Sequence, residues 1–306
     1  MTAREPFARQ VALLVRLLPS IYRYKEVFAL KGGTAINLFH RNLPRLSVDI
    51  DLTYLPVKDR NASLAEIDET LSAIMDDAKS LRGVTARRIA GGGGGATRIL
   101  ADDGKAMIKV ETSPVTRGIV GNTQTLPACD LVMDEFGFAE AEVVSFEDLY
   151  GGKIHAALDR QHPRDLFDIA QLYENEGLTD ELLRTFMVYL ASSSRPVHEL
   201  LDPNGINIEQ AFKNEFVGMT QEPVDLADLI AARQMLIEDI QGRLHGPVAE
   251  FLRSLQAGDP DFDVLGYPEA AKLPAIRWKL QNLRRLIDTD PNKHVDQTEQ
   301  LHRLLS

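Results

Sequence analysis

The chain has 306 residues, of which 44% are hydrophobic and 26% charged, so it is expected to fold into globular domains and not to be disordered. Its formal net charge of −11 argues against a protein that coats nucleic acid, because such proteins carry a basic excess. The single cysteine, Cys129, excludes an internal disulfide framework and a cysteine-rich zinc site, and it favours a reducing, cytoplasmic location. No apolar run of about 18 residues predicts a membrane span.

The first half of the chain alternates between helical and extended patterns. Apolar residues at helical spacing predict helices over residues 5–19 and 62–81, and Thr34 after the double glycine predicts the start of a helix over 34–41. Apolar or alternating runs predict strands over residues 27–30, 47–55, 85–90, 97–101 and 105–112, with extended chain to about residue 144. The five glycines at 91–95 predict a mobile hairpin loop, because such a run cannot form the interior of an element.

The second half of the chain is helical in pattern from residue 145 onward. Ser145 and Asp148 have the spacing of a capping box and begin a helix, and Pro163 suits the first turn of the next one. The predicted fold class is therefore α+β. An α/β domain with a mixed sheet is expected over residues 1–144, followed by an α-helical bundle over residues 145–306.

Two aspartates share the polar face of the strand predicted at residues 47–55. Side chains alternate between the faces of a strand, so Asp49 and Asp51 point to one side, about 7 Å apart. Aspartate is disfavoured in strands, and two like charges repel each other unless a cation lies between them. Hard divalent cations such as Mg²⁺ bind carboxylate oxygens, so the pair predicts a metal site. Taken alone, the pattern fits a solvated polar face equally well.

A double glycine, Gly32-Gly33, follows the apolar strand predicted at 27–30. A strand, a tight turn and a helix start leave backbone N–H groups free to hold a phosphate, and Thr34 can cap the helix. Alone, a double glycine also fits an ordinary turn. Because Gly33 precedes Asp49 by only sixteen residues, one short helix can bring the phosphate cradle to the carboxylates. Phosphoryl transfer requires those parts together.

A lysine and an aspartate lie symmetrically about the loop that joins the first two helices of the second half. Two antiparallel helices with a short connection place Lys153 opposite Asp168. Lys153 also lies on an apolar stripe, where a lysine is either a paired buried charge or a site residue. Gly151 and Gly152 inside the helix cost about 1 kcal/mol each relative to alanine, which is tolerable where a backbone or ligand approaches closely. The spacing leaves open a structural Lys–Asp pair with glycines that ease helix packing.

Four segments together resemble the AbiEii/AbiGii (MenT-like) toxin nucleotidyltransferases, which belong to the polymerase-β-like nucleotidyltransferase superfamily. The segments are LKGGTA at 30–35, RLSVDIDL at 45–52, DLYGGK at 148–153 and RDLFDI at 164–169. The chain has Gly33-Thr34 where the superfamily usually has Gly-Ser, and threonine keeps the hydroxyl. No single segment is specific by itself, whereas the combination is.

The resemblance implies a polymerase-β-like fold for the first domain. It implies an enzyme that transfers NMP from an NTP to an acceptor hydroxyl and releases pyrophosphate. It further implies a toxin with a cognate protein antitoxin, Mg²⁺ as the metal, and the tRNA 3′ end as the acceptor, so that translation is blocked. Two alternatives stay open, namely nucleotidylation of a protein or small molecule, and a catalytically silent nucleotide-binding module.

The resemblance also implies roles for the residues singled out above. Asp49 and Asp51 would bind Mg²⁺, with Glu111 on a neighbouring strand as a third ligand; the alternative for Glu111 is a solvent-facing Lys–Glu strand edge. Lys153 would contact the nucleotide phosphates, and Asp168 would orient Lys153 or help to activate the acceptor hydroxyl. The residues expected to hold the triphosphate are Gly32, Gly33, Thr34 and Ser47.

A basic stretch without acids, residues 271–287, lies near the C-terminus. Its charged residues and its aromatic are Lys272, Arg277, Trp278, Lys279, Arg284 and Arg285. Basic residues beside an aromatic can hold an RNA backbone and stack a base. An amphipathic helix with a cationic solvated face explains the stretch at least as well.

Overall fold

The computed structural model describes residues 4–91 and 95–306, which group into two compact units. The first unit contains the chain up to Ser145 and the segment Phe216–Val224, and the second contains Phe146–Glu215 and Asp225–Ser306. The sequence placed all of residues 145–306 in one helical domain, so the return of Phe216–Val224 to the first unit was not expected.

Backbone hydrogen bonds hold this returning segment in the first unit. The N–H of Leu46 donates to the carbonyl of Met219 at 2.7 Å, and Arg45 and Thr220 form an isolated antiparallel bridge. Pairing between backbone groups so far apart in the chain leaves no periodic pattern of side chains. For that reason this pairing could not be predicted from the sequence.

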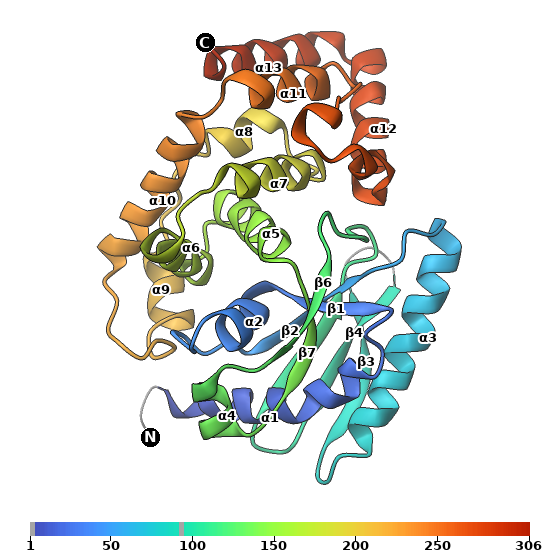
Figure 1. Ribbon diagram of the computed structural model, residues 1–306, viewed down its shortest axis with the longest axis vertical. Helices are drawn as coiled ribbons and strands as arrows, with labels where there is room; N and C mark the ends of the chain where they lie inside the picture. Colours follow the sequence, from blue (N-terminus) through green and yellow to red (C-terminus); the bar gives the residue numbers. More distant parts are fainter. Residues whose placement is uncertain (1–3, 92–94) are drawn as a thin grey trace. The chain divides into compact units, whose positions relative to one another are not determined.

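A seven-stranded mixed sheet is the centre of the first unit (Figure 1). Its strands are β1 (Phe28–Lys31), β2 (Asp49–Tyr54), β3 (Thr85–Gly91), β4 (Gly95–Asp102), β5 (Met107–Thr112), β6 (Thr123–Pro127) and β7 (Glu140–Val144). They lie in the order β3-β4-β5-β2-β1-β7-β6. The pairs β2–β5 and β1–β7 are parallel and the others antiparallel. The α+β class with a mixed sheet, predicted from the sequence, is therefore confirmed.

Helices pack on this sheet. They are α1 (Glu5–Tyr22), α2 (Gly32–Ala35) with the π-helical turn η1 (Ile36–His40) that continues it, α3 (Arg60–Lys79) and α4 (Asp130–Phe136). Helix α1 contacts β5 and β7, and α3 contacts β3 and β4. Helix α4 interrupts the stretch predicted to be extended, so that part of the prediction is wrong. It buries only Val132, and one apolar contact leaves almost no helical period to detect.

The glycine run joins β3 to β4. These two strands pair antiparallel, with Gly91 opposite Gly95, so the hairpin closes between them. Residues 92–94 lie outside the described residues, and the mobility expected for the loop stays a prediction.

Helices make up the second unit wherever the structure describes it (Figure 1). They are α5 (Phe146–Asp159), α6 (Pro163–Asn175), α7 (Asp180–Ala191), α8 (Val197–Leu201), α9 (Glu209–Glu215), α10 (Leu226–Gln241), α11 (Gly246–Gln256), α12 (Pro274–Thr289) and α13 (Pro291–Leu304), with short 3₁₀ turns η2 (Asp263–Leu265) and η3 (Pro268–Lys272). Helix α5 packs against α6 and α7. Pro163 begins α6 as predicted, and His162 caps it by accepting a hydrogen bond from the N–H of Arg164. Across residues 4–91 and 95–306, none of the helices combines the length and apolar character that a membrane span requires.

Candidate active site

Gly32 and Gly33 are the first two residues of α2, which follows β1 directly. Gly32 has φ +73°, a left-handed conformation that costs a residue with a side chain about 1–2 kcal/mol. A Cβ on Gly32 would lie 2.7 Å from Oδ2 of Asp51. A Cβ on Gly33 would lie 2.5 Å from Nη2 of Arg45 and 3.2 Å from Oγ of Ser47. The backbone conformation and the contact with Asp51 favour glycine at Gly32, whereas a side chain at Gly33 would have to displace the guanidinium of Arg45. A close approach of bare backbone to a carboxylate suits a phosphate site.

The hydroxyls of Thr34 and Ser47 connect the start of α2 to β2. The Oγ1 of Thr34 lies 2.9 Å from Oγ of Ser47 and donates to the carbonyl of Asp49 at 2.5 Å. Both residues are buried, with 1% and 6% of their surface exposed. In this structure the two hydroxyls therefore fix the start of α2 against the start of β2. Their contact with a triphosphate stays a prediction.

Asp49 and Asp51 share one face of β2. Each is partly exposed, whereas Ile50 between them is fully buried, so the alternation predicted for this strand is confirmed. Two carboxylates on one face of a strand offer only oxygen ligands, and Mg²⁺ prefers oxygen ligands. The pair therefore fits a bound Mg²⁺.

A row of four charged residues crosses the sheet at the level of Asp51. The pairing of strands β1, β2, β5 and β4 places Lys31, Asp51, Glu111 and Arg98 side by side in that order. Burial lowers the pKa of Lys31, while the negative charges of Asp51 and Glu111 act in the opposite direction. Lys31 and Arg98 were not predicted as site residues, because their proximity to the carboxylates depends on which strands pair.

The carboxylate of Glu111 forms ion pairs with two basic side chains in this structure. Its Oε2 lies 2.7 Å from Nε of Arg98 and 3.2 Å from Nζ of Lys109. Within the described residues, no three His, Cys, Asp or Glu side chains are grouped so that they could hold a metal ion. Asp49 and Asp51 are the pair that fits Mg²⁺, whereas Oε2 of Glu111 is paired with Arg98 and Lys109. Its role as a third ligand stays a prediction.

Gly32→Ala is expected to lower the free energy of unfolding more than Gly83→Ala does. Both glycines have a positive φ, +73° and +77°, so each substitution costs about 1–2 kcal/mol in backbone strain. Only at Gly32 does the new Cβ crowd another atom, Oδ2 of Asp51, since nothing described lies within 4 Å at Gly83. We expect about 1 kcal/mol of further loss for Gly32→Ala, measured by urea unfolding. Nucleotidyl transfer should fall in Gly32→Ala and not in Gly83→Ala. Equal losses of stability and activity in the two variants would contradict the close approach of Gly32 to Asp51.

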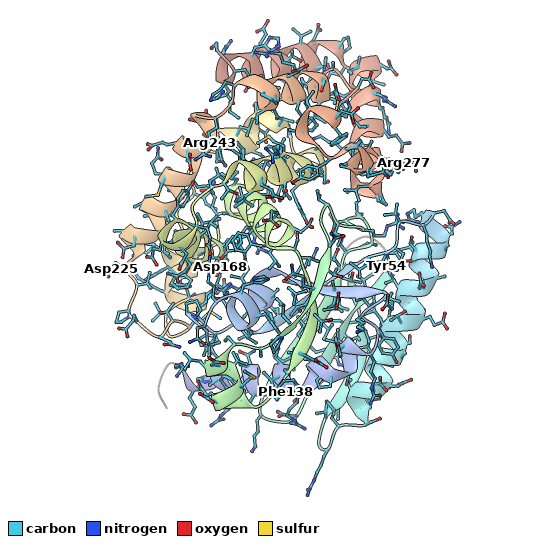
Figure 2. The ribbon with its side chains drawn as sticks, in the orientation of Figure 1. Tyr54, Phe138, Asp168, Asp225, Arg243 and Arg277 are labelled. Atoms are coloured by element: carbon cyan, nitrogen blue, oxygen red, sulfur yellow. The ribbon has the colours of Figure 1, made fainter. Side chains whose placement is uncertain are left out.

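In the second unit, Lys153 of α5 faces Asp168 of α6, as the symmetrical spacing predicted. The Nζ of Lys153 lies 2.9 Å from Oδ2 of Asp168, which Figure 2 labels on its helix. The same Nζ lies 2.7 Å from Oδ1 of Asp165, which was not predicted as a site residue. The side chains of Lys153, Asp165 and Asp168 are almost fully buried, with 5%, 1% and 0% exposed. A signal for Asp165 did exist, because it precedes Asp168 by three residues on the same helix and so shares its face.

Asp165 joins two cations. Its carboxylate also accepts from Arg160, at 2.5 Å from Nε and 3.0 Å from Nη2. Burial by itself would raise the pKa of Asp165, but Lys153 and Arg160 outweigh that effect and hold this pKa well below its usual range. Asp165 therefore stays ionised and fixes the ammonium of Lys153 in place next to Asp168.

The double glycine inside α5 makes room for Tyr189 of α7. A Cβ on Gly151 would lie 2.9 Å from Cδ2 of Tyr189, and a Cβ on Gly152 would lie 3.4 Å from its Cε1. The hydroxyl of Tyr189 donates to Oδ1 of the buried Asp148 at 2.9 Å. Of the two explanations left open by the sequence, the structure supports close helix packing for these glycines.

Gly151→Ala and Gly152→Ala are expected to change stability in opposite directions. Alanine gains about 1 kcal/mol over glycine inside a helix. At Gly152 the new methyl group would make an ordinary contact, so the variant should be up to about 1 kcal/mol more stable. At Gly151 it would push the ring of Tyr189, and overpacking of this kind costs about 1–3 kcal/mol. Thermal unfolding of both variants checks the difference, and a stabilised Gly151→Ala would show that Tyr189 does not pack as described.

The two glycines, the strand carboxylates and the mixed sheet are features that an enzyme of phosphoryl transfer can use. Residues 13–282 match the family model described as "Nucleotidyl transferase AbiEii toxin, Type IV TA system". The chain belongs to this family and is a nucleotidyltransferase toxin of a type IV toxin–antitoxin system.

Solved structures with a similar fold include that of MenT4, a nucleotidyltransferase toxin from Mycobacterium tuberculosis, with a TM-score of 0.61 and 16% sequence identity. The similarity covers 94% of this chain and 95% of that chain, and at this identity it concerns the fold. No curated protein sequence matches the chain.

Proposed function

We propose that this toxin transfers NMP from an NTP to the 3′ end of tRNA in the cytoplasm, and that the added nucleotide blocks translation. The observation that carries the proposal is the approach of the bare backbone at Gly32 to the carboxylate of Asp51. This approach supports the proposal because backbone N–H groups can donate to phosphate oxygens and a nearby carboxylate can bind a divalent cation. The tRNA end as acceptor rests on the resemblance of the four sequence segments.

Each unit supplies residues in this proposal. In the first unit, the backbone of Gly32 and Gly33 holds the triphosphate, with Thr34 and Ser47 behind it, and Asp49 and Asp51 hold Mg²⁺. When bound, Mg²⁺ neutralises charge on the triphosphate. In the second unit, the residues with catalytic roles are Lys153 and Asp168.

The reaction is an in-line displacement at the α-phosphorus. The acceptor hydroxyl oxygen forms a bond to the α-phosphorus, its proton passes to a carboxylate, and the bond to the β-phosphate oxygen breaks so that pyrophosphate leaves. Lys153 stabilises the negative charge that develops on the phosphate oxygens. Asp165 and Asp168 hold the ammonium of Lys153 at 2.7 and 2.9 Å, so it is oriented before the substrate arrives.

The test is transfer of label from each α-labelled NTP, in the presence of Mg²⁺, to total tRNA. The expected result is labelled tRNA with at least one NTP. Periodate-oxidised tRNA, which has lost the diol of its terminal ribose, should accept no label. Addition of the cognate antitoxin should relieve the growth inhibition that the active toxin causes.

Other outcomes would replace this proposal. Label on a protein or on a small molecule would show a different acceptor for the same chemistry. No transfer from any NTP, together with undiminished toxicity of Asp49→Ala, would show that toxicity does not depend on this site.

A further inference from the structure

The exposed face of α12 carries arginines around the single tryptophan of the chain. Trp278 has 55% of its surface exposed, and Arg277, labelled in Figure 2, precedes it on the helix. Among the residues that the structure describes, neither Arg277 nor Arg285 has a carboxylate partner. The buried residues of this helix are Ala275, Ile276 and Leu283, so the exposed indole of Trp278 lies outside its buried face.

Two lysines of the basic stretch do not belong to this face. The ammonium of Lys279 donates to the carbonyl of Arg195. Burial lowers the pKa of Lys279 to about 8, although the negative charge of Glu199 acts to raise it. Lys272 pairs with Glu269 at 2.5 Å. The cationic face, which we call the α12 face, therefore consists of Arg277, Trp278, Gln281, Asn282, Arg284 and Arg285.

Helical spacing arranges these side chains in two rows. Arg277 and Arg284 lie seven residues apart, which is about two turns, or roughly 10 Å along the axis. Trp278 and Arg285 have the same spacing beside them, with the amides of Gln281 and Asn282 between the ends. Arg284 uses its Nε for the carbonyl of Gly258, at 3.1 Å, which holds its guanidinium in position on the helix. The last turn of α12 holds Asp288, the sole acid of this helix.

We infer that the α12 face binds single-stranded RNA, with phosphates on the arginines and one base stacked on Trp278. Guanidinium groups bind phosphate through a planar fork of donors, and an exposed indole is a stacking platform for any base. Amides between the two rows can hydrogen-bond base edges. The choice of RNA over DNA rests on the proposed function. The surface itself is outside the residues assigned to catalysis, so it would dock the substrate and take no part in the chemical step.

Trp278 provides the direct test, because no other tryptophan contributes to the fluorescence of this chain. The full chain is titrated with a short single-stranded RNA of mixed sequence, without NTP or Mg²⁺. Stacking of a base should quench and shift the tryptophan emission, and the titration should saturate. Poly-glutamate of equal charge is the second probe, and it should leave the emission unchanged.

Substitutions then separate stacking from charge, with binding measured by the anisotropy of labelled RNA. Trp278→Ala should weaken binding by about 5- to 150-fold, the range for loss of one stacked base. Arg277→Gln with Arg285→Gln should make the slope of log K against log salt shallower by about 1.4, or about 0.7 for each lost phosphate contact. The control for charge is Arg253→Gln with Lys293→Gln, two exposed cations of the same unit, and it should leave binding within about twofold of the wild type.

The inference is overturned if RNA fails to bind, if it binds without changing the emission of Trp278, or if poly-glutamate quenches as strongly as RNA. It is also overturned if the Arg277/Arg285 variant has the same salt slope as the control. Since no NTP is present, the result does not depend on catalysis. Quenching by RNA without any nucleotidyl transfer would uphold the α12 face and contradict the proposed function. If Trp278→Ala transferred nucleotide to tRNA as well as the wild type does, the proposed function would be upheld and the α12 face would be contradicted.

Discussion

Asp51→Asn is expected to lower nucleotidyl transfer by about a thousandfold while the protein stays folded. Asparagine keeps the size of the side chain beside Gly32 but removes the charge that would hold a divalent cation. Metal assistance supplies several kcal/mol of transition-state stabilisation, and about 4 kcal/mol corresponds to that factor. The free energy of unfolding should change by less than the activity, because the lost attraction between Asp51 and Lys31 is offset in part by relief of the repulsion between Asp51 and Glu111.

The matched control is Asp134→Asn on α4, an exposed aspartate of the same unit. It should keep full transfer activity and an unchanged melting temperature. Glu111→Gln is the informative comparison, because Arg98 and Lys109 neutralise this carboxylate. A loss in Glu111→Gln as large as that in Asp51→Asn would show that Glu111 does bind the metal. If Asp51→Asn kept its activity, the assignment of the metal pair would be wrong.

Lys153→Met should destabilise the second unit by about 3–5 kcal/mol in addition to abolishing transfer. The substitution leaves Asp165 and Asp168 buried with no ammonium between them, and breaking a buried ion pair on one side costs this much. Lys213→Met, which breaks the exposed pair with Glu209, is the control and should cost under about 1 kcal/mol. Urea unfolding of the three proteins at pH 7 measures the difference. A loss no larger than that of Lys213→Met would contradict the burial of the cluster.

The cost of Lys153→Met should also depend on pH. The pKa of Asp165 is depressed in the folded protein, so its contribution to stability is complete above the unfolded value of about 3.9 and is lost as the pH falls through the folded value. In the variant, burial raises this pKa with less opposition, so Asp165 takes up a proton earlier as the pH falls. The stability gap between wild type and variant is therefore expected to be widest near pH 7 and to narrow on acidification toward pH 4. A gap that widens on acidification would mean that Asp165 is not held ionised by Lys153.

Local patterns in the sequence were enough to predict the elements that carry most of the candidate site. A double glycine after an apolar run indicated where the strand ends and a helix begins, although the helix starts at Gly32 and not at Thr34 as predicted. The alternation around Ile50 placed Asp49 and Asp51 on one face. The symmetry of Lys153 and Asp168 about their loop predicted their contact, which the structure shows at 2.9 Å. Each of these features depends on residues close together in the chain, where backbone geometry fixes which side chains share a face.

The tertiary structure decided everything that depends on pairing between distant segments. The order of β1, β2, β5 and β4 places Lys31 and Arg98 next to the carboxylates. Backbone pairing with Arg45 and Leu46 places the segment Phe216–Val224 in the first unit. Lys279 is a further example. The sequence pattern grouped it with the exposed arginines of the basic stretch, whereas in the structure its ammonium donates to the carbonyl of Arg195. A period of 2 or 3.6 residues tells which face a side chain takes, whereas the partner on that face is chosen by packing and by backbone hydrogen bonds that carry no sequence signature.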